Sequence, residues 1–116
     1  MLENFGIGID IVNINRFEQT PFEKNKKFYQ KIFSADEIKY SKKFKNPYPH
    51  FAGKFAIKEA TVKSIKEKIS VKEIITYHVS SKPKIKLLKK NNYEFLVSVS
   101  HEKDTAIAVV ISKLKN

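Results

Sequence analysis

The chain has 116 residues, a length that suits one domain with a single hydrophobic core. A hydrophobic fraction of 41% argues against disorder, and the absence of cysteine excludes disulfides and thiolate metal sites. No stretch approaches the ~20 apolar residues of a membrane span, and the first residues lack a signal-peptide pattern, so we expect a cytoplasmic protein.

The net charge of +11 would attract polyanions such as nucleic acid, phosphorylated small molecules or an acidic protein. The lysine-rich composition is also consistent with a general compositional habit. Arg16, the single arginine, stands out because its planar guanidinium can bind a partner through two parallel hydrogen bonds.

The stretch Phe5–Val12 predicts a β-strand because bulky residues alternate with small or polar ones. Three isoleucines fall on one side, and the other side carries Gly8, Asp10 and Val12. The glycines weaken a strand unless a backbone or a ligand approaches closely. Since aspartate is depleted in strands, Asp10 is either an edge charge in water or a functional carboxylate.

Three helices are expected to follow this strand. Asn13–Glu18 forms a short one that carries Arg16, and Thr20-Pro21 begins a second over Phe22–Phe33. Ser34 and Glu37 have the spacing of a capping box, which begins a third helix through about Phe44.

After a proline-rich break at residues 46–49, the stretch His50–Lys68 has the apolar spacing of a helix. In it, Glu59 lies among three lysines: Lys54, Lys58 and Lys63. One interpretation is an amphipathic core helix with a solvated lysine face and a Glu59–Lys63 pair. The other is a carboxylate framed by cations in an anion pocket, which requires a second acidic residue elsewhere.

The hydrophobic period then changes to two, which predicts strands at Ile74–Val79, Lys84–Leu88, Tyr93–Ser100 and Thr105–Ile111. Turns are expected at Ser80–Pro83, Lys89–Asn92 and His101–Asp104. His78 is interpreted as a strand-pairing or surface residue rather than a ligand. We therefore expect a single α+β domain over residues 1–116, with an N-terminal strand, helices, and an antiparallel sheet packed on a long central helix.

Nucleophilic triads, glycine-rich phosphate loops and zinc spacings are not indicated by the sequence. Two isolated carboxylates, Asp10 and Glu59, remain within a basic protein. A site with few carboxylates suits Mg²⁺, which keeps several waters and takes its other ligands from substrate phosphates.

Four segments, spread over nearly the whole chain, carry its most specific patterns: Gly6–Val12 followed by Arg16, Phe33–Glu37, Phe51–Lys63, and Ser98–His101 with Ala106–Ala108. In this order they resemble the motifs of holo-[acyl-carrier-protein] synthases, the small bacterial 4′-phosphopantetheinyl transferases. The resemblance implies that fold. It also implies transfer of phosphopantetheine from coenzyme A to a serine of an apo carrier protein, with release of adenosine 3′,5′-bisphosphate, in support of fatty acid biosynthesis.

The resemblance also implies roles for individual residues. Asp10 and Glu59 would hold Mg²⁺, Lys63 would neutralise phosphate charge, and Glu59, directly or through a metal-bound water, would be the candidate general base. Coenzyme A binding is assigned to Lys54, Lys58, Lys63, Lys82, Pro83, Ser100 and His101. Carrier-protein binding is assigned to Arg16 and Phe55. The family is typically a homotrimer with active sites at subunit boundaries.

Several positions depart from the family pattern. Lys54 replaces a common arginine, His50 replaces an aromatic residue, and Ser81 replaces a turn glycine. A small basic nucleic-acid-binding domain is an alternative that explains the charge but not Asp10 or Glu59. A structural homo-oligomer without catalysis is the other. Since the resemblance favours the transferase, we expect neither nucleic acid nor membrane as a partner.

Overall fold

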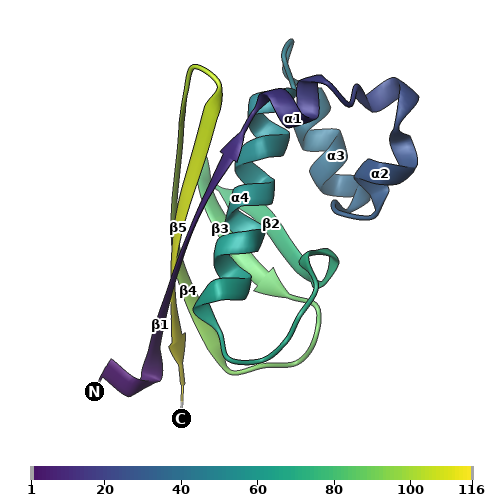
Figure 1. The fold of residues 1–116 in the computed structure, drawn as a ribbon. Coiled ribbons are helices and arrows are strands. Elements are labelled where there is room, and N and C mark those ends of the chain that lie inside the picture. The colour runs from purple at the N-terminus through teal and green to yellow at the C-terminus, as the bar shows by residue number, and fades with distance from the viewer. Residues whose placement is uncertain (1, 116) are drawn as a thin grey trace.

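A long helix crosses one face of a three-stranded antiparallel sheet in this protein, whose computed structural model describes residues 2–115 (Figure 1). The helix is α4, Tyr48–Ser64, and the sheet has the strand order β1-β5-β4. The strands are β1 Phe5–Asn13, β4 Tyr93–Glu102 and β5 Thr105–Leu114. The two outer residues of the expected domain, Met1 and Asn116, lie outside the described residues.

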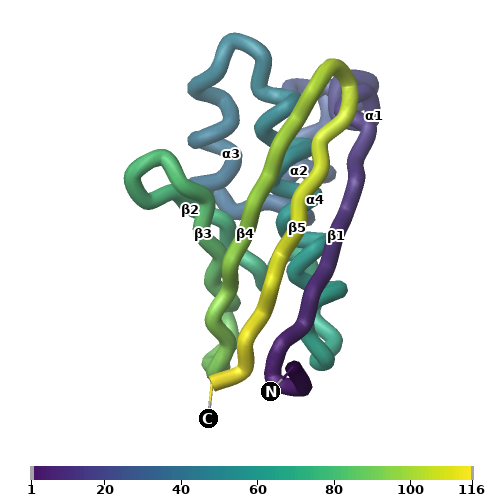
Figure 2. The backbone as a smooth tube through the Cα atoms, turned by 90° about the vertical axis from the view of Figure 1, so that its left-hand side faces the viewer, coloured from purple at the N-terminus to yellow at the C-terminus, as the bar shows by residue number. Residues whose placement is uncertain are grey.

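A two-stranded hairpin of β2, Ile74–Val79, and β3, Lys82–Leu87, lies beside β4 (Figure 2). The remaining elements are short. The 3-10 turn η1, Leu2–Asn4, precedes β1, and the others connect the strands and α4: α1 Asn15–Glu18, η2 Phe22–Lys24, α2 Lys26–Gln30, α3 Ala35–Lys42 and η3 Val71–Glu73. The expected α+β class, with a long helix packed on antiparallel strands, is confirmed. No helix within residues 2–115 is long and apolar enough to cross a bilayer.

Strand β1 lies directly against α4 because two of its residues have no side chain. A Cβ atom on Gly6 would lie 1.8 Å from the Ser64 carbonyl oxygen, and one on Gly8 would lie 1.9 Å from that of Ala60. The close backbone approach expected at these glycines is confirmed. A side chain at either position would force β1 away from the helix.

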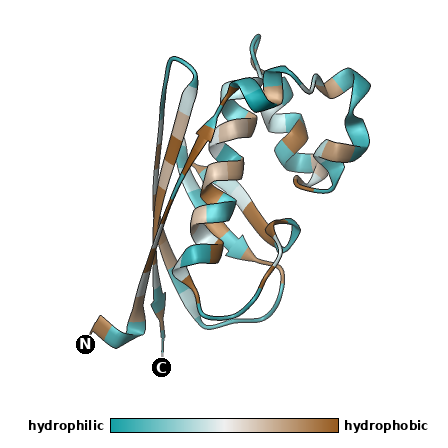
Figure 3. Cartoon of the chain, in the orientation of Figure 1, coloured by the Kyte–Doolittle hydropathy of each residue, from teal (hydrophilic) through white to brown (hydrophobic). Residues whose placement is uncertain are grey.

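The two faces of the sheet differ in what covers them. The face toward α4 carries the buried residues Val12, Ala106, Ala108 and Val110. The isoleucines of β1 occupy the opposite face, as expected from their alternation, and they are exposed (brown along β1 in Figure 3). This outer face is apolar but uncovered in the single chain.

The prediction of one continuous helix over Phe22–Phe33 is wrong. A 3-10 turn, η2, comes first, and the separate helix α2 follows it. Asn25 lies between them with φ −139° and ψ 37°, and its Nδ2 donates to the Pro21 carbonyl at 2.8 Å. This side-chain hydrogen bond competes with continued helical pairing.

The central helix is offset from the expected His50–Lys68. It begins at Tyr48 and includes Pro49 in its first turn. A proline is tolerated there because the backbone N–H groups of a helix's first turn have no partner within the helix, so the N–H that proline lacks is not needed. It ends at Ser64, where Ile65 turns to extended backbone with φ −118° and ψ 159°. The capping box of α3 is confirmed, since Ser34 Oγ accepts from the Glu37 N–H at 3.2 Å and Ser34 N donates to Glu37 Oε1 at 2.7 Å.

The β2–β3 turn is shorter than expected. Only Ser80 and Ser81 connect the strands, with φ of 51° and 68°, so Lys82 and Pro83 belong to β3. Both φ values lie in the left-handed region of two-residue hairpin turns. Strands β4 and β5 also extend beyond the expected ends, leaving Lys103 and Asp104 as the tip between them.

Candidate active site

Asp10 and Lys63, 53 residues apart in the sequence, form an ion pair between β1 and α4. Asp10 follows Gly8 on the face of β1 that packs on the helix. Lys63 Nζ lies 3.1 Å from Asp10 Oδ1 and donates to the Ile9 carbonyl at 2.9 Å. The Asp10 side chain is 16% exposed, so a ligand can still reach its carboxylate. β1 is an edge strand, but the interpretation of Asp10 as a charge pointing into water is wrong, since its side chain faces the helix and pairs with Lys63.

Glu59 precedes Lys63 by one turn of α4, and residues four apart share a helix face. Glu59 is half-buried, and its side chain forms no hydrogen bond or ion pair within residues 2–115. The expected Glu59–Lys63 pair is absent there because Lys63 pairs with Asp10. Glu59 thus lies on the side of the helix that meets β1 at Asp10, with its carboxylate available.

The chemistry of this donor set fits a hard divalent cation. Asp10 and Glu59 supply carboxylate oxygens from two separate elements, and Lys63 adds a positive charge beside them. Within the described residues there is no group of three or more acidic, histidine or cysteine side chains that could hold a metal. Water and substrate phosphates would have to complete the coordination shell, which is typical of Mg²⁺.

A second feature is a small pocket of about 70 Å³ between α3, α4, the β2–β3 hairpin and β4. Three predicted coenzyme A residues meet in its wall: Lys54, Pro83 and His101. The sequence separates these residues by up to 47 positions, and the packing of β3 and of α4 beside β4 brings them together.

Lys54 is the charged group of this pocket and is only 4% exposed. Its Nζ donates to Thr76 Oγ1 at 3.0 Å and lies 4.5 Å from the centre of the Tyr40 ring. Burial lowers the pKa of Lys54 to about 8, although the negative charge of Glu37 opposes that effect. Near neutral pH Lys54 is therefore a cation, but one that an anionic ligand would stabilise.

All three histidines of the chain line the same pocket. His78 stacks on Tyr40 with ring centres 4.3 Å apart, and His50 stacks on Phe44 at 3.6 Å. Burial, followed by nearby cationic groups, lowers the pKa of both His50 and His78. The interpretation of His78 as a strand-pairing residue holds, since it pairs with Pro83, but it also faces the pocket.

Sequence reasoning missed His78 and Tyr40 as pocket residues. Recognising Ser80-Ser81 as a two-residue turn would have found His78, because that register places His78 opposite Pro83. Tyr40 gave no signal beyond its place on an amphipathic helix.

Lys58 lies in the core and does not line the pocket, which argues against its sequence-based assignment to coenzyme A binding. Its side chain is 0% exposed, and its ammonium lies 2.7 Å from Glu37 Oε1. It also donates to three backbone carbonyls, those of Ile32, Val71 and Ile74. Burial raises the pKa of Glu37, but the hydrogen bond and charge of Lys58 outweigh it, so the net pKa is below the usual value.

Two other assigned residues lie apart from the pocket. Ser100 pairs with Ile107 on the outer face of the sheet, whereas its neighbour His101 pairs with Ala106 on the α4 side. Lys82 is exposed and faces away from Pro83, because successive strand residues point to opposite faces. Direct contact of these two side chains with a ligand in the pocket is not supported by this single chain.

Arg16 and Phe55, the assigned carrier-protein residues, lie together. The Arg16 guanidinium carbon is 5.4 Å from the centre of the Phe55 ring. Arg16 is exposed on α1 and Phe55 is half-buried on α4. They form a cationic and aromatic surface at the end of β1 that leads into α1.

A model of the 4′-phosphopantetheinyl transferase superfamily matches residues 6–110 of this chain. The chain belongs to that superfamily. Holo-[acyl-carrier-protein] synthases of Thermodesulfovibrio yellowstonii and Clostridium kluyveri are 37% and 41% identical to it, over 91% and 95% of this chain and 96% and 90% of theirs. The sequence-based family resemblance is thereby confirmed, and the chain is a phosphopantetheinyl transferase enzyme.

Solved structures agree with the fold. A holo-(acyl-carrier-protein) synthase of Bacillus anthracis in complex with CoA (3′,5′-ADP) has a TM-score of 0.80 and 30% identity, over 95% of this chain and 96% of that one. The Helicobacter pylori enzyme in complex with coenzyme A has a TM-score of 0.77 and 32% identity, over 92% and 99%. The matched superfamily region includes Asp10, Glu59, Lys63 and the pocket residues.

Proposed function

We propose that the protein transfers 4′-phosphopantetheine from coenzyme A to a serine of an apo acyl carrier protein. The serine oxygen attacks the pantetheine-side phosphorus of the diphosphate, and the P–O bond to adenosine 3′,5′-bisphosphate breaks. The observation that carries this proposal is the meeting of Asp10 and Lys63 beside Glu59, between β1 and α4, in a chain of this superfamily. We place the reaction in fatty acid biosynthesis in the cytoplasm.

Asp10 and Glu59 would hold Mg²⁺. When bound, this ion would neutralise the diphosphate of coenzyme A and polarise it toward attack. Lys63 adds a second positive charge, and its hydrogen bond to the Ile9 carbonyl fixes that charge beside β1. Glu59, which has no partner within residues 2–115, is positioned to accept the serine proton directly or through water.

The pocket around Lys54 would bind the adenosine phosphates. Lys54 and His101 supply cationic or hydrogen-bonding groups, and Pro83 supplies part of the apolar wall. The remaining rings of the pocket give a nucleotide flat surfaces to contact. We do not assign Lys58 to this role, because its donors are used inside the core.

The acidic carrier protein would dock at Arg16 and Phe55. A net charge of +11 raises the rate of encounter with an acidic partner, and the Arg16 fork can bind a carboxylate through two hydrogen bonds.

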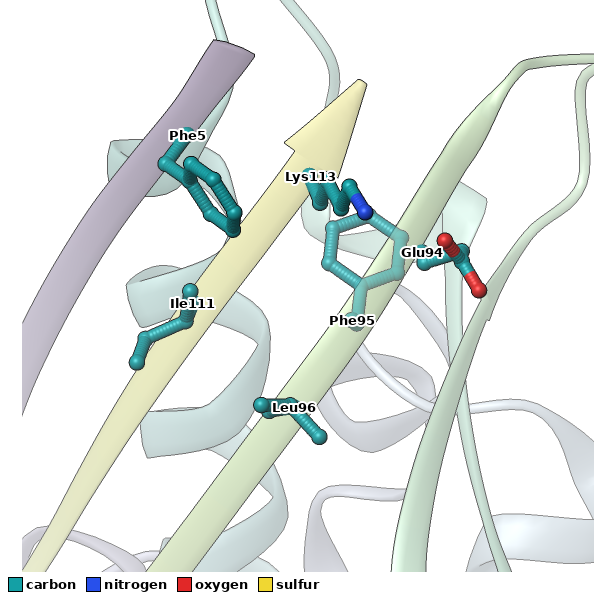
Figure 4. Close-up of a pocket in the computed structure, with 6 residues that line it drawn as sticks. All are labelled: Phe5, Glu94, Phe95, Leu96, Ile111 and Lys113. Atoms are coloured by element: carbon teal, nitrogen blue, oxygen red, sulfur yellow. The ribbon is translucent and has the colours of Figure 1, made fainter. Parts of the chain in front are cut away.

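The chain would act as a homotrimer, a proposal supported by the outer face of the sheet. Ile7, Ile9 and Ile11 are 68%, 57% and 67% exposed there, and Leu96 is 70% exposed. A hollow of about 240 Å³ lies on this region. Figure 4 shows three of its lining side chains, Phe5, Leu96 and Ile111, on the neighbouring strands β1, β4 and β5. Soluble monomers rarely expose so continuous an apolar surface.

We also propose that residues 1–116 act as one catalytic domain, because α4 packs on strands from both ends of the chain. Asp10 comes from the first strand and His101 from β4, so neither half of the chain contains both candidate sites.

The test is to incubate the protein with coenzyme A, Mg²⁺ and an apo carrier protein and to weigh the carrier by mass spectrometry. A gain of one phosphopantetheine group supports the proposal, and Asp10→Asn or Glu59→Gln should abolish the gain without loss of folding. Asp36→Asn, an exposed carboxylate of α3, is the matched control and should retain transfer. No gain, together with tight nucleic-acid binding, would favour the basic-domain alternative.

A further inference from the structure

A buried chain of hydrogen bonds ends at the Lys54 ammonium. Lys54 Nζ donates to Thr76 Oγ1 at 3.0 Å, and Thr76 Oγ1 donates to Glu37 Oε2 at 2.9 Å. The three residues come from α4, β2 and α3 and are 4%, 3% and 1% exposed. These hydrogen bonds therefore extend from the core to the pocket wall without access to bulk water.

The direction of this chain is fixed by its two ends. An ammonium group can only donate, and an ionised carboxylate can only accept. The single Thr76 hydroxyl hydrogen must therefore go to Glu37, and the Thr76 oxygen must accept from Lys54. The Thr76 backbone N–H also donates to Glu37 Oε2 at 2.7 Å, which holds β2 and this carboxylate together.

Lys54 has no other hydrogen-bond acceptor among residues 2–115, so two of its three N–H groups remain for a ligand. The Tyr40 ring covers one side of the ammonium at 4.5 Å. A lysine ammonium is carried on a flexible four-carbon side chain that can take many conformations. A hydrogen-bond acceptor in a fixed position therefore selects the conformation and with it the position of the charge. The acceptor here is the hydroxyl of Thr76.

We propose that Thr76 is a positioning residue for coenzyme A binding: its hydroxyl, anchored by Glu37, aims the Lys54 ammonium at phosphate oxygens in the pocket. This inference rests on the proposed function, since it assumes that the pocket takes the phosphates of coenzyme A. Thr76 itself does not need to contact the substrate.

The same arrangement has a pH signature. The free Lys54 has a pKa of about 8, lowered chiefly by burial. A hydrogen bond from the ammonium to the Thr76 hydroxyl oxygen favours the charged form of Lys54. The titratable or charged groups that face Lys54 are Glu37 and Tyr40 from α3, Lys58 and His50 from α4, His78 from β2 and His101 from β4. Removing the hydroxyl leaves these groups in place, so a change in the pH profile would report the Thr76 contact itself.

The experiment compares Thr76→Val with Thr76→Ser and with Thr61→Val in steady-state transfer assays. Valine keeps the shape of threonine without its hydroxyl, and serine restores the hydroxyl. Thr61 is also fully buried, but its hydroxyl donates to the Ile57 carbonyl within α4, so it is the matched control. Loss of a hydrogen bond to a charged group predicts a KM for coenzyme A raised about tenfold or more in Thr76→Val.

Three results together support the proposal: kcat within about twofold of wild type, KM restored by serine, and a falling limb of kcat/KM moved to lower pH. An unchanged KM and pH profile in a folded Thr76→Val protein would overturn it. An equal KM increase in Thr61→Val would also overturn it, because the effect would then be a general loss of packing. A wild-type protein that neither binds coenzyme A in calorimetry nor transfers it refutes the proposed function instead.

If Thr76→Val does not fold at the assay temperature, the wild-type protein supplies the test. Nitrogen-detected NMR of the lysine ammonium groups would show a Lys54 signal protected from solvent exchange before coenzyme A is added, and shifted after it. A Lys54 ammonium in fast exchange with water, or one that does not respond to coenzyme A, would overturn the positioning role.

Discussion

Replacing Lys58 by methionine tests whether this lysine stabilises the fold or binds the substrate. In the folded protein its ammonium lies 2.7 Å from Glu37 Oε1 and 2.7 Å from the Ile74 carbonyl oxygen, with no exposure to solvent. Methionine has a similar length but no donor. The Glu37 carboxylate would then be left buried with its hydrogen bonds from Ser34 and Thr76 but without its neutralising charge.

The expected loss follows from this geometry. Removing one partner of a buried ion pair costs about 3–5 kcal/mol, because the other charge stays buried. A domain of this kind is stable by about 5–15 kcal/mol, so the loss is a large fraction of the total. Adding Glu37→Gln should recover part of it, because glutamine removes the unpaired charge and can still complete the capping box.

The measurement is the free energy of unfolding from urea titrations followed by circular dichroism, with coenzyme A affinity measured on the folded fraction. Lys39→Met, an exposed lysine on α3, is the control and should change the free energy of unfolding by no more than about 0.5 kcal/mol. A Lys58→Met protein of nearly wild-type stability that binds coenzyme A tenfold more weakly would refute the reasoning and return Lys58 to the ligand set.

Three further predictions follow from single features. The kcat/KM for coenzyme A should fall as pH rises through about 8, where free Lys54 loses its charge, and Lys54→Arg should keep its activity above that pH. Ser81→Gly should raise the free energy of unfolding by about 1 kcal/mol, because φ is 68° there, and thermal melts would show it. Ile9→Lys, at a position 57% exposed on the outer face, should convert an assembly into folded monomers in analytical ultracentrifugation. A protein already monomeric before the change would contradict this last prediction.

Features that depend on neighbouring residues were predictable from the sequence. The alternation in β1 correctly separated the isoleucines from Gly8 and Asp10, because side-chain direction in a strand has a fixed period of two. The capping box of α3 was also correct, since both partners lie within one turn. The family resemblance implied that Asp10, Glu59 and Lys63 serve one site, but the ion pair between Asp10 and Lys63 was not predicted, because no local rule links residues 53 positions apart.

The position of Lys58 could not be read from spacing alone. Lys54, Lys58 and Lys63 have similar surroundings in the sequence, and the usual place for a lysine is in solvent. The structure buries two of them because α3 brings Glu37 against α4, and only tertiary packing determines that. The helix expected over residues 22–33 failed for a related reason: a side-chain hydrogen bond at Asn25 outweighed helix propensity.

The same buried network connects the fold to its ligand. Glu37 is one carboxylate shared by two buried ammonium groups, directly with Lys58 and through Thr76 with Lys54. The network therefore carries one excess positive charge, which lies at the pocket end, on Lys54. Desolvation of that charge is unfavourable unless an anion accompanies it. Bound phosphate would provide that anion and raise the pKa of Lys54 again, so proton uptake should accompany coenzyme A binding above pH 8. The pocket would therefore gain affinity for an anion from the positive charge of Lys54, which no carboxylate of the buried network neutralises.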